Sequence, residues 1–64
     1  MRLTRREQQV LSLIVEGHSS KEVASILDVS KRTIDFHLDN LYQKLGVTNR
    51  MQALQRALYL GLLS

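Results

Sequence analysis

The chain has 64 residues, with nine Lys or Arg against six Asp or Glu and a net charge of +3 at pH 7. It contains no cysteine, which excludes a disulfide framework and a thiolate metal site. Its apolar residues never run together for the roughly 18 positions that a membrane span needs, and so short a chain leaves little room to enclose a substrate. We therefore predict one small domain that is neither an enzyme nor a membrane protein.

The first two helices can be predicted from their capping residues. Thr4 with Glu7 three positions later forms a capping box, and the helix that follows is stopped by Gly17. Ser19 with Glu22 forms a second capping box and opens a short helix. Each pair places a hydroxyl and a carboxylate where they can bond the free N–H groups of a first helical turn.

Two further helices follow in the second half of the chain. Ser30 is an N-cap candidate for a helix over 31–45, with Gly46 in the C-terminal stop position. Asn49 opens a fourth helix that ends at Gly61. The sequence has no proline, and no segment alternates apolar and polar residues for long enough to suggest a strand. The predicted fold class is all-α, with four helices.

The connection between the second and third helices is unusually short. Only Asp28 and Val29 precede the Ser30 cap, a length that favours the steep corner of a helix-turn-helix. Asp28 tolerates the left-handed backbone conformation that such a corner often requires. The alternative is an ordinary tight connection in a helical bundle.

The third helix has one apolar stripe and an opposite face that carries an aromatic residue. At about 100° per residue, the stripe is formed by Ile34, Leu38, Leu41 and Leu45. On the other side Phe36 can pack on thymine methyl groups and Arg32 can bond guanine. Carboxylates there would have to accept from cytosine N4 or act by excluding other bases. The residues predicted to contact bases are Arg32, Asp35, Phe36 and Asp39. The alternative is that Phe36 is half-buried against a neighbouring helix and that the charges only solvate the surface.

Groups suited to phosphate surround this face. Hydroxyls at helix N-termini, amides and cations fix a protein on a duplex without reading its sequence. The predicted phosphate contacts are Ser20, Lys21, Ser30, Thr33, His37, Asn40 and Lys44. Taken singly, each is more often a cap or a solvated side chain, so the prediction depends on their convergence. Neither His18 nor His37 has the neighbours of a metal ligand or catalytic base, and we expect no metal and no cofactor.

The fourth helix has more apolar surface than one packing contact uses. Ala53, Ala57 and Leu60 form one stripe beside a second apolar stripe. If the first faces the core, the second is available to another copy of the chain. The predicted dimer interface is Met51, Leu54, Leu58 and Leu62. The alternative is a single broad stripe covered by the first helix.

The order of these motifs resembles a known family. Leu3-Thr4-Arg5-Arg6-Glu7, Lys21-Glu22-Val23-Ala24, Arg32-Thr33-Ile34 and Lys44-Leu45-Gly46-Val47 are similar to the LuxR/GerE-type (NarL/FixJ-like) helix-turn-helix domain of bacterial transcription regulators. The resemblance covers essentially the whole chain, from Leu3 to about Leu60, and implies one DNA-binding domain over 1–64. It implies a helix-turn-helix at 20–39, a recognition helix at 31–45 that enters the major groove, and a dimerisation helix at 50–60.

The same resemblance implies a function and its partners. We expect sequence-specific binding to double-stranded DNA for transcription regulation, as a homodimer on inverted half-sites and in the cytoplasm, and the resemblance allows RNA polymerase as a further partner. The family commonly has Gly where this chain has Asp28, and Lys, Arg or a neutral residue at Asp35 and Asp39, which predicts a slightly strained turn and an unusual operator. The chain is either a stand-alone regulator or the output module of a longer one. The two aspartates favour the alternative function, a helical protein-interaction module that uses the Phe36 face.

Overall fold

The computed structural model describes residues 2–62 and contains four helices joined by short loops. They are α1 (Arg5–Val15), α2 (Ser20–Leu27), α3 (Lys31–Leu45) and α4 (Arg50–Leu60). No strand occurs in this part of the chain, and the all-α prediction is confirmed. Positions 1, 63 and 64 of the expected 1–64 domain lie outside the described residues.

Each helix begins at the predicted capping residue. In α1 the Thr4 hydroxyl accepts from the Glu7 N–H at 3.1 Å, and the Glu7 carboxylate accepts from the Thr4 N–H at 2.8 Å. The same reciprocal pair opens α2. At α4 the Asn49 side chain accepts from the Gln52 N–H at 2.9 Å, but the Gln52 side chain accepts from Thr48 rather than closing a box. These bonds satisfy N–H groups that a helix start leaves without an intrahelical partner.

The helices also end in a common way, with a residue of positive φ followed by a backbone bond that closes the last turn. At the end of α2, Asp28 has a φ of 57°, and the Val29 N–H donates to the Ala24 carbonyl at 3.0 Å. This six-residue closure is a Schellman motif. It recurs after α3 at Gly46 and after α4 at Gly61. The left-handed conformation predicted for Asp28 is confirmed.

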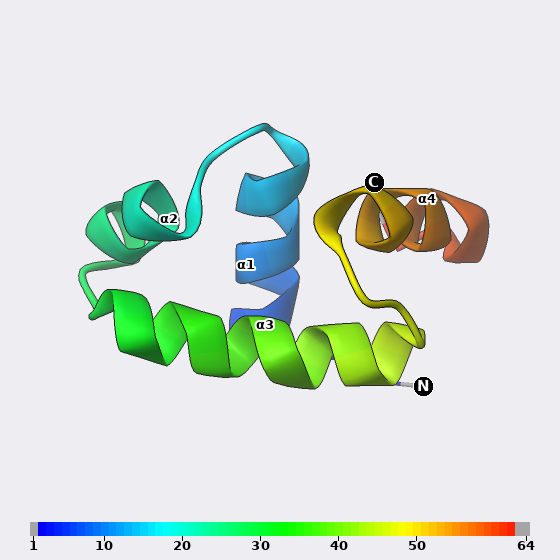
Figure 1. Cartoon of the computed structure of the whole chain (residues 1–64), viewed down its shortest axis with the longest axis horizontal. Helices are drawn as coiled ribbons and strands as arrows, with labels where there is room; N and C mark the ends of the chain where they lie inside the picture. The colour runs from blue at the N-terminus through cyan, green and yellow to red at the C-terminus, as the bar shows by residue number, and fades with distance from the viewer. Residues whose placement is uncertain (1, 63–64) are drawn as a thin grey trace.

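The helices pack around one core, in which α3 is the common element. It contacts α1, α2 and α4, and α1 also contacts α2. Figure 1 shows α3 running across one side of the molecule, with α2 beside its first half and α4 beyond its last turn. At the short connection over 28–30, α2 and α3 meet at a steep angle, as predicted for a helix-turn-helix.

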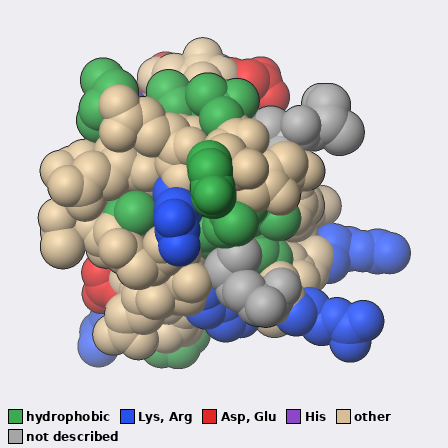
Figure 2. All heavy atoms as spheres, turned by 90° about the vertical axis from the view of Figure 1, so that its right-hand side faces the viewer, with side chains coloured by type: hydrophobic (Ala, Val, Ile, Leu, Met, Phe, Trp, Pro, Cys, Tyr) green, Lys and Arg blue, Asp and Glu red, His purple; other side chains and the backbone are tan. Residues whose placement is uncertain are grey.

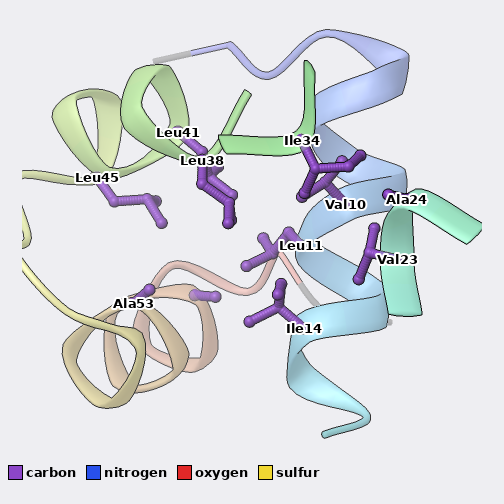
Figure 3. Packing of buried hydrophobic residues seen from close by; sticks show 11 residues of the cluster. Val10, Leu11, Ile14, Val23, Ala24, Ile34, Leu38, Leu41, Leu45 and Ala53 are labelled. Atoms are coloured by element: carbon purple, nitrogen blue, oxygen red, sulfur yellow. The ribbon is translucent and has the colours of Figure 1, made fainter. Parts of the chain in front are cut away.

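The predicted apolar stripe of α3 supplies the centre of the core. Its four residues are at most 8% exposed, and Ile34 and Leu41 are completely buried. Leu11 of α1 lies between them and α4 (Figure 3). The fully buried residues of α4 are the small Ala53 and Ala57. α4 therefore contributes little volume to the core, and most of its larger apolar side chains lie outside the core.

Candidate nucleic-acid interface

The face of α3 opposite the core is exposed and carries the residues predicted to contact bases. Arg32 and Asp39 are exposed, and Phe36 between them is 63% exposed. The alternative of a half-buried Phe36 is therefore wrong. The Phe36 ring meets the His37 ring edge-on, with centroids 5.9 Å apart. An exposed aromatic beside a guanidinium gives this face an apolar surface and a cationic donor, the two kinds of group that read base edges in a major groove.

One of the two aspartates on this helix has its charge balanced by a lysine that the sequence reasoning missed. The Lys31 ammonium lies 2.8 Å from the Asp35 carboxylate, one helical turn away. Both side chains are more than 40% exposed, so the pair adds little stability. Its effect is electrostatic, because the Lys31 charge offsets the negative charge of Asp35 on this face. The sequence could have predicted this pair, because Lys31 and Asp35 are four residues apart on one helix and therefore neighbours on its surface.

The hydroxyl groups predicted to meet phosphate lie at two separate helix starts. Ser30 caps α3 and accepts from the Thr33 N–H at 3.1 Å, and the two hydroxyls lie 2.9 Å apart. Ser20 and Lys21 are the first residues of α2, at the end of that helix away from the 28–30 turn. An eight-residue helix is about 12 Å long. The structure therefore brings Ser30 and Thr33 together, with α2 separating them from Ser20 and Lys21.

Two further predicted phosphate contacts, His37 and Asn40, lie on α3 and are half-buried. Lys44 has an internal partner that the sequence did not reveal. Its ammonium lies 2.6 Å from the Glu7 carboxylate and also donates to the Arg2 carbonyl at 3.3 Å. Lys44 therefore joins the last turn of α3 to the start of α1.

Glu7 is the buried charged residue of the described chain, with its side chain 5% exposed. Burial works to raise the pKa of this carboxyl, but hydrogen bonds from Lys44 and Thr4, together with the Lys44 charge, bring the pKa below its ordinary value of 4.5. The Lys44 ammonium and the Thr4 backbone N–H together outweigh desolvation here because both donate to the same carboxylate oxygen.

The outer side of α4 carries exposed apolar residues, as expected, but these do not include all four predicted interface residues. Met51 and Leu58 are more than 60% exposed, and Leu54 is half-buried. Leu62 instead packs against the core, and its carbonyl accepts from the Gln8 side chain at 2.8 Å. The surface view of this end of the molecule shows hydrophobic side chains at several places (Figure 2).

An apolar groove adjoins this surface where the end of α1 meets the start of α4. It has a volume of about 380 Å³ and is lined by Ile14, Val15, Gly17, Arg50, Met51 and Leu54. Within residues 2–62 no three His, Cys, Asp or Glu side chains are grouped to hold a metal ion. No helix in that part of the chain is both long and apolar enough to cross a membrane.

Comparison with known proteins gives one family and a consistent set of relatives. The model for bacterial regulatory proteins of the luxR family matches residues 1–57. HTH-type transcriptional regulator MalT of Yersinia pestis (strain Pestoides F) is 54% identical over 55 residues, which are 86% of this chain and 6% of MalT. MalT of Klebsiella pneumoniae subsp. pneumoniae is also 54% identical over 55 residues. The chain thus spans only a small fraction of these relatives.

Solved structures agree with this match. The transcription factor GerE superposes with a TM-score of 0.88 and 42% identity, over 97% of this chain and 92% of GerE. The response regulator ChrA of a heme-sensing two-component system gives a TM-score of 0.94 with 35% identity, over 98% of this chain and 31% of ChrA. At this coverage the likeness extends over all four helices.

Proposed function

The chain belongs to the luxR family of bacterial regulatory proteins, and from that premise we propose how this helix-turn-helix DNA-binding domain of a transcription regulator recognises double-stranded DNA. In the proposal α3 enters the major groove with Arg32, Asp35, Phe36 and Asp39 toward the base edges. Ser20, Lys21, Ser30, Thr33, His37 and Asn40 hold the phosphates on either side. This mode of binding places the domain on chromosomal DNA in the cytoplasm.

The observation that carries this proposal is the exposure of Phe36. A large apolar side chain that is 63% exposed on the second helix of a helix-turn-helix has no role in the core. A thymine methyl group would remove much of that ring from water. Arg32 lies one turn before it, where a guanidinium can make two hydrogen bonds to the guanine O6 and N7 atoms.

The internal contacts of Lys44 change its place in the proposal. Two of its three N–H donors already serve Glu7 and Arg2, so we assign Lys44 to the fold and leave it out of the phosphate set. Asp35 is paired with Lys31 and Asp39 has no ion pair within the described residues. Of the two aspartates, we therefore assign the base contact to Asp39, whose carboxylate would accept a hydrogen bond from a cytosine amino group.

We further propose that two copies bind inverted half-sites through α4. Met51, Leu54 and Leu58 supply an apolar surface that water otherwise covers, and a symmetric contact would use the same surface on both copies. Leu62 is excluded from this interface because it packs on the core of its own chain. A dimer of this kind places the two α3 helices in successive major grooves, which requires a two-fold symmetric operator.

The test is selection of bound sites from a random DNA pool, followed by anisotropy titration of the selected duplex. We expect a two-fold symmetric consensus. Arg32→Ala should then weaken binding by about 1–3 kcal/mol and relax preference at one base pair per half-site, whereas Arg56→Ala, an exposed arginine of α4, should leave that preference unchanged. Failure to enrich any sequence, with no binding to bulk duplex at low salt, would favour a protein partner for the Phe36 face.

A further inference from the structure

Three arginines near the start of the chain have no role in the interface described so far. Arg2 and Arg5 are exposed and Arg6 is half-buried. None of them forms an ion pair with any residue of the described chain. Figure 2 shows long Lys and Arg side chains extending into solvent from the lower part of the molecule. We refer to Arg2, Arg5 and Arg6 as the arginine cluster.

The fold gives no reason for placing these charges here. Arg5 and Arg6 are the first two residues of α1, where the helix dipole favours anions and disfavours cations. The one acid of that turn, Glu7, is buried and already neutralised by Lys44. The cluster therefore costs α1 some stability and is not balanced by an internal anion, which points to an anion supplied from outside.

The cluster is held beside the recognition helix. The Lys44 ammonium donates to the Arg2 carbonyl at 3.3 Å and bonds Glu7 at 2.6 Å, so the segment 2–7 lies against the last turn of α3. From residue 40 to residue 64 the sequence has no acid. The other carboxylates of this part of the chain are Glu16 at the C-cap of α1, Glu22 in the first turn of α2 and Asp28 at the C-cap of α2, and none lies in the first turn of α1.

We propose that the arginine cluster binds DNA phosphates that flank the groove occupied by α3. The fifteen residues of α3 span about 22 Å, whereas the major groove is about 12 Å wide. A helix that begins in the groove therefore carries its last turn, and the segment tied to it, to the sugar-phosphate backbone. This inference rests on the proposed function and adds to it a second anchoring point, at the opposite end of α3 from Ser30 and Thr33.

The test measures how binding to a labelled mixed-sequence duplex depends on salt. Neutralising the cluster in Arg2→Gln/Arg5→Gln/Arg6→Gln should lower the slope of log affinity against log salt by about 0.9 for each phosphate that the cluster neutralises, or up to about 2.7 per protomer. Because Gln removes a cation from the positive end of α1, thermal stability should stay unchanged or rise. If the triple variant folds poorly, the single variant Arg2→Gln provides the same test, because Arg2 precedes the helix.

A matched control separates specific placement from net charge. Arg5→Gln and Arg50→Gln each remove one exposed positive charge, but Arg50 lies at the start of α4, beside Val15 and Gly17 at the opposite end of α1 from Arg5. We expect only the first to lower the slope, by about 0.9. Equal effects of the two substitutions would overturn the inference.

The remaining outcomes are also decisive. If the unmodified chain shows no salt-dependent binding to duplex DNA, the proposed function fails together with this inference. If it binds and the triple variant keeps the same slope, only the inference fails. Loss of binding to phosphatidylglycerol vesicles in the triple variant, with an unchanged DNA slope, would reassign the cluster to a membrane surface.

Discussion

The ion pair formed by Glu7 and Lys44 fixes the last turn of α3 to the start of α1, and its strength can be predicted from the structure. The Glu7 side chain is 5% exposed and its carboxylate accepts from Lys44 at 2.6 Å, whereas the Lys44 side chain is 36% exposed. Lys44→Met keeps the aliphatic stem and removes the ammonium. It leaves the carboxylate buried with the Thr4 N–H as its remaining donor in the described chain.

The expected loss follows from these exposures. A hydrogen bond to a charged group contributes about 1.5–3 kcal/mol. Because the Lys44 head is partly in water, the lower end applies, about 1.5 kcal/mol. For a domain of this size that corresponds to a fall in Tm of about 6–12 °C. Glu7→Gln keeps an acceptor for Thr4 and frees Lys44 to reach solvent, so it should cost about 1 kcal/mol.

A double-mutant cycle measured by urea denaturation at pH 7 checks this reasoning. The variant with both Glu7→Gln and Lys44→Met should lose about 1.5 kcal/mol rather than the sum of the single losses, which leaves a coupling of about 1 kcal/mol. Lys31→Met is the matched control, since Lys31 bonds Asp35 at 2.8 Å with both side chains well exposed, and should cost no more than about 0.5 kcal/mol. Additive losses, or a control as costly as Lys44→Met, would refute the argument.

Three other measurements follow from the structure. Because the pKa of Glu7 is below 4.5 in the folded chain, its carboxylate stabilises the fold above about pH 4.5, and this contribution is lost as the pH falls through the folded-state pKa. The difference in free energy of unfolding between the unmodified chain and Glu7→Gln, measured by denaturation at successive pH values, should therefore shrink below about pH 4.5. A difference that stays constant with pH would contradict this prediction. Asp28→Gly should raise the free energy of unfolding by about 0.5–1 kcal/mol, because Asp28 holds a φ of 57° that glycine adopts without Cβ strain. This value allows for the greater freedom of glycine in the unfolded chain, which offsets part of the gain. A loss of stability in thermal melts would show that the Asp28 side chain contributes more than its backbone strain costs. Leu58→Asp, at a position that is 61% exposed, should change the stability of the isolated domain by no more than about 0.5 kcal/mol. The same substitution should prevent two copies from binding together to a symmetric duplex. If sedimentation of the complex still finds two copies, α4 is not the interface.

Local signals in the sequence were sufficient for the helices and their ends. The caps at Thr4, Ser19 and Ser30 act over three residues, and a hydroxyl beside the free N–H groups of a first turn forms its bond whatever surrounds it. The left-handed turn at Asp28 is local in the same way. The helical period also placed Ile34 inside and Phe36 outside, because the angle between two side chains on one helix is fixed.

Partnerships between distant parts of the chain were beyond that reasoning. Lys44 is 37 residues from Glu7, and on its own helix it occupies a position that fits a phosphate contact equally well. Leu62 matches the apolar stripe of α4 by composition, yet the turn after Gly61 folds it back onto the core. In both cases the side chain's chemistry allowed either role, and only the packing of helices decided between them.

The sequence by itself determined the four helices, the helix-turn-helix corner and the outward face of α3, because these depend on capping, periodicity and backbone conformation within a few residues. Tertiary structure alone decided which charges have a partner in a distant part of the folded chain. Packing α1 against α3 pairs Lys44 with the buried Glu7, and it places the start of the chain, with Arg2, beside the last turn of α3. A charge contributes to binding only if no nearer partner satisfies it, and that depends on distances in the folded chain that no local pattern contains.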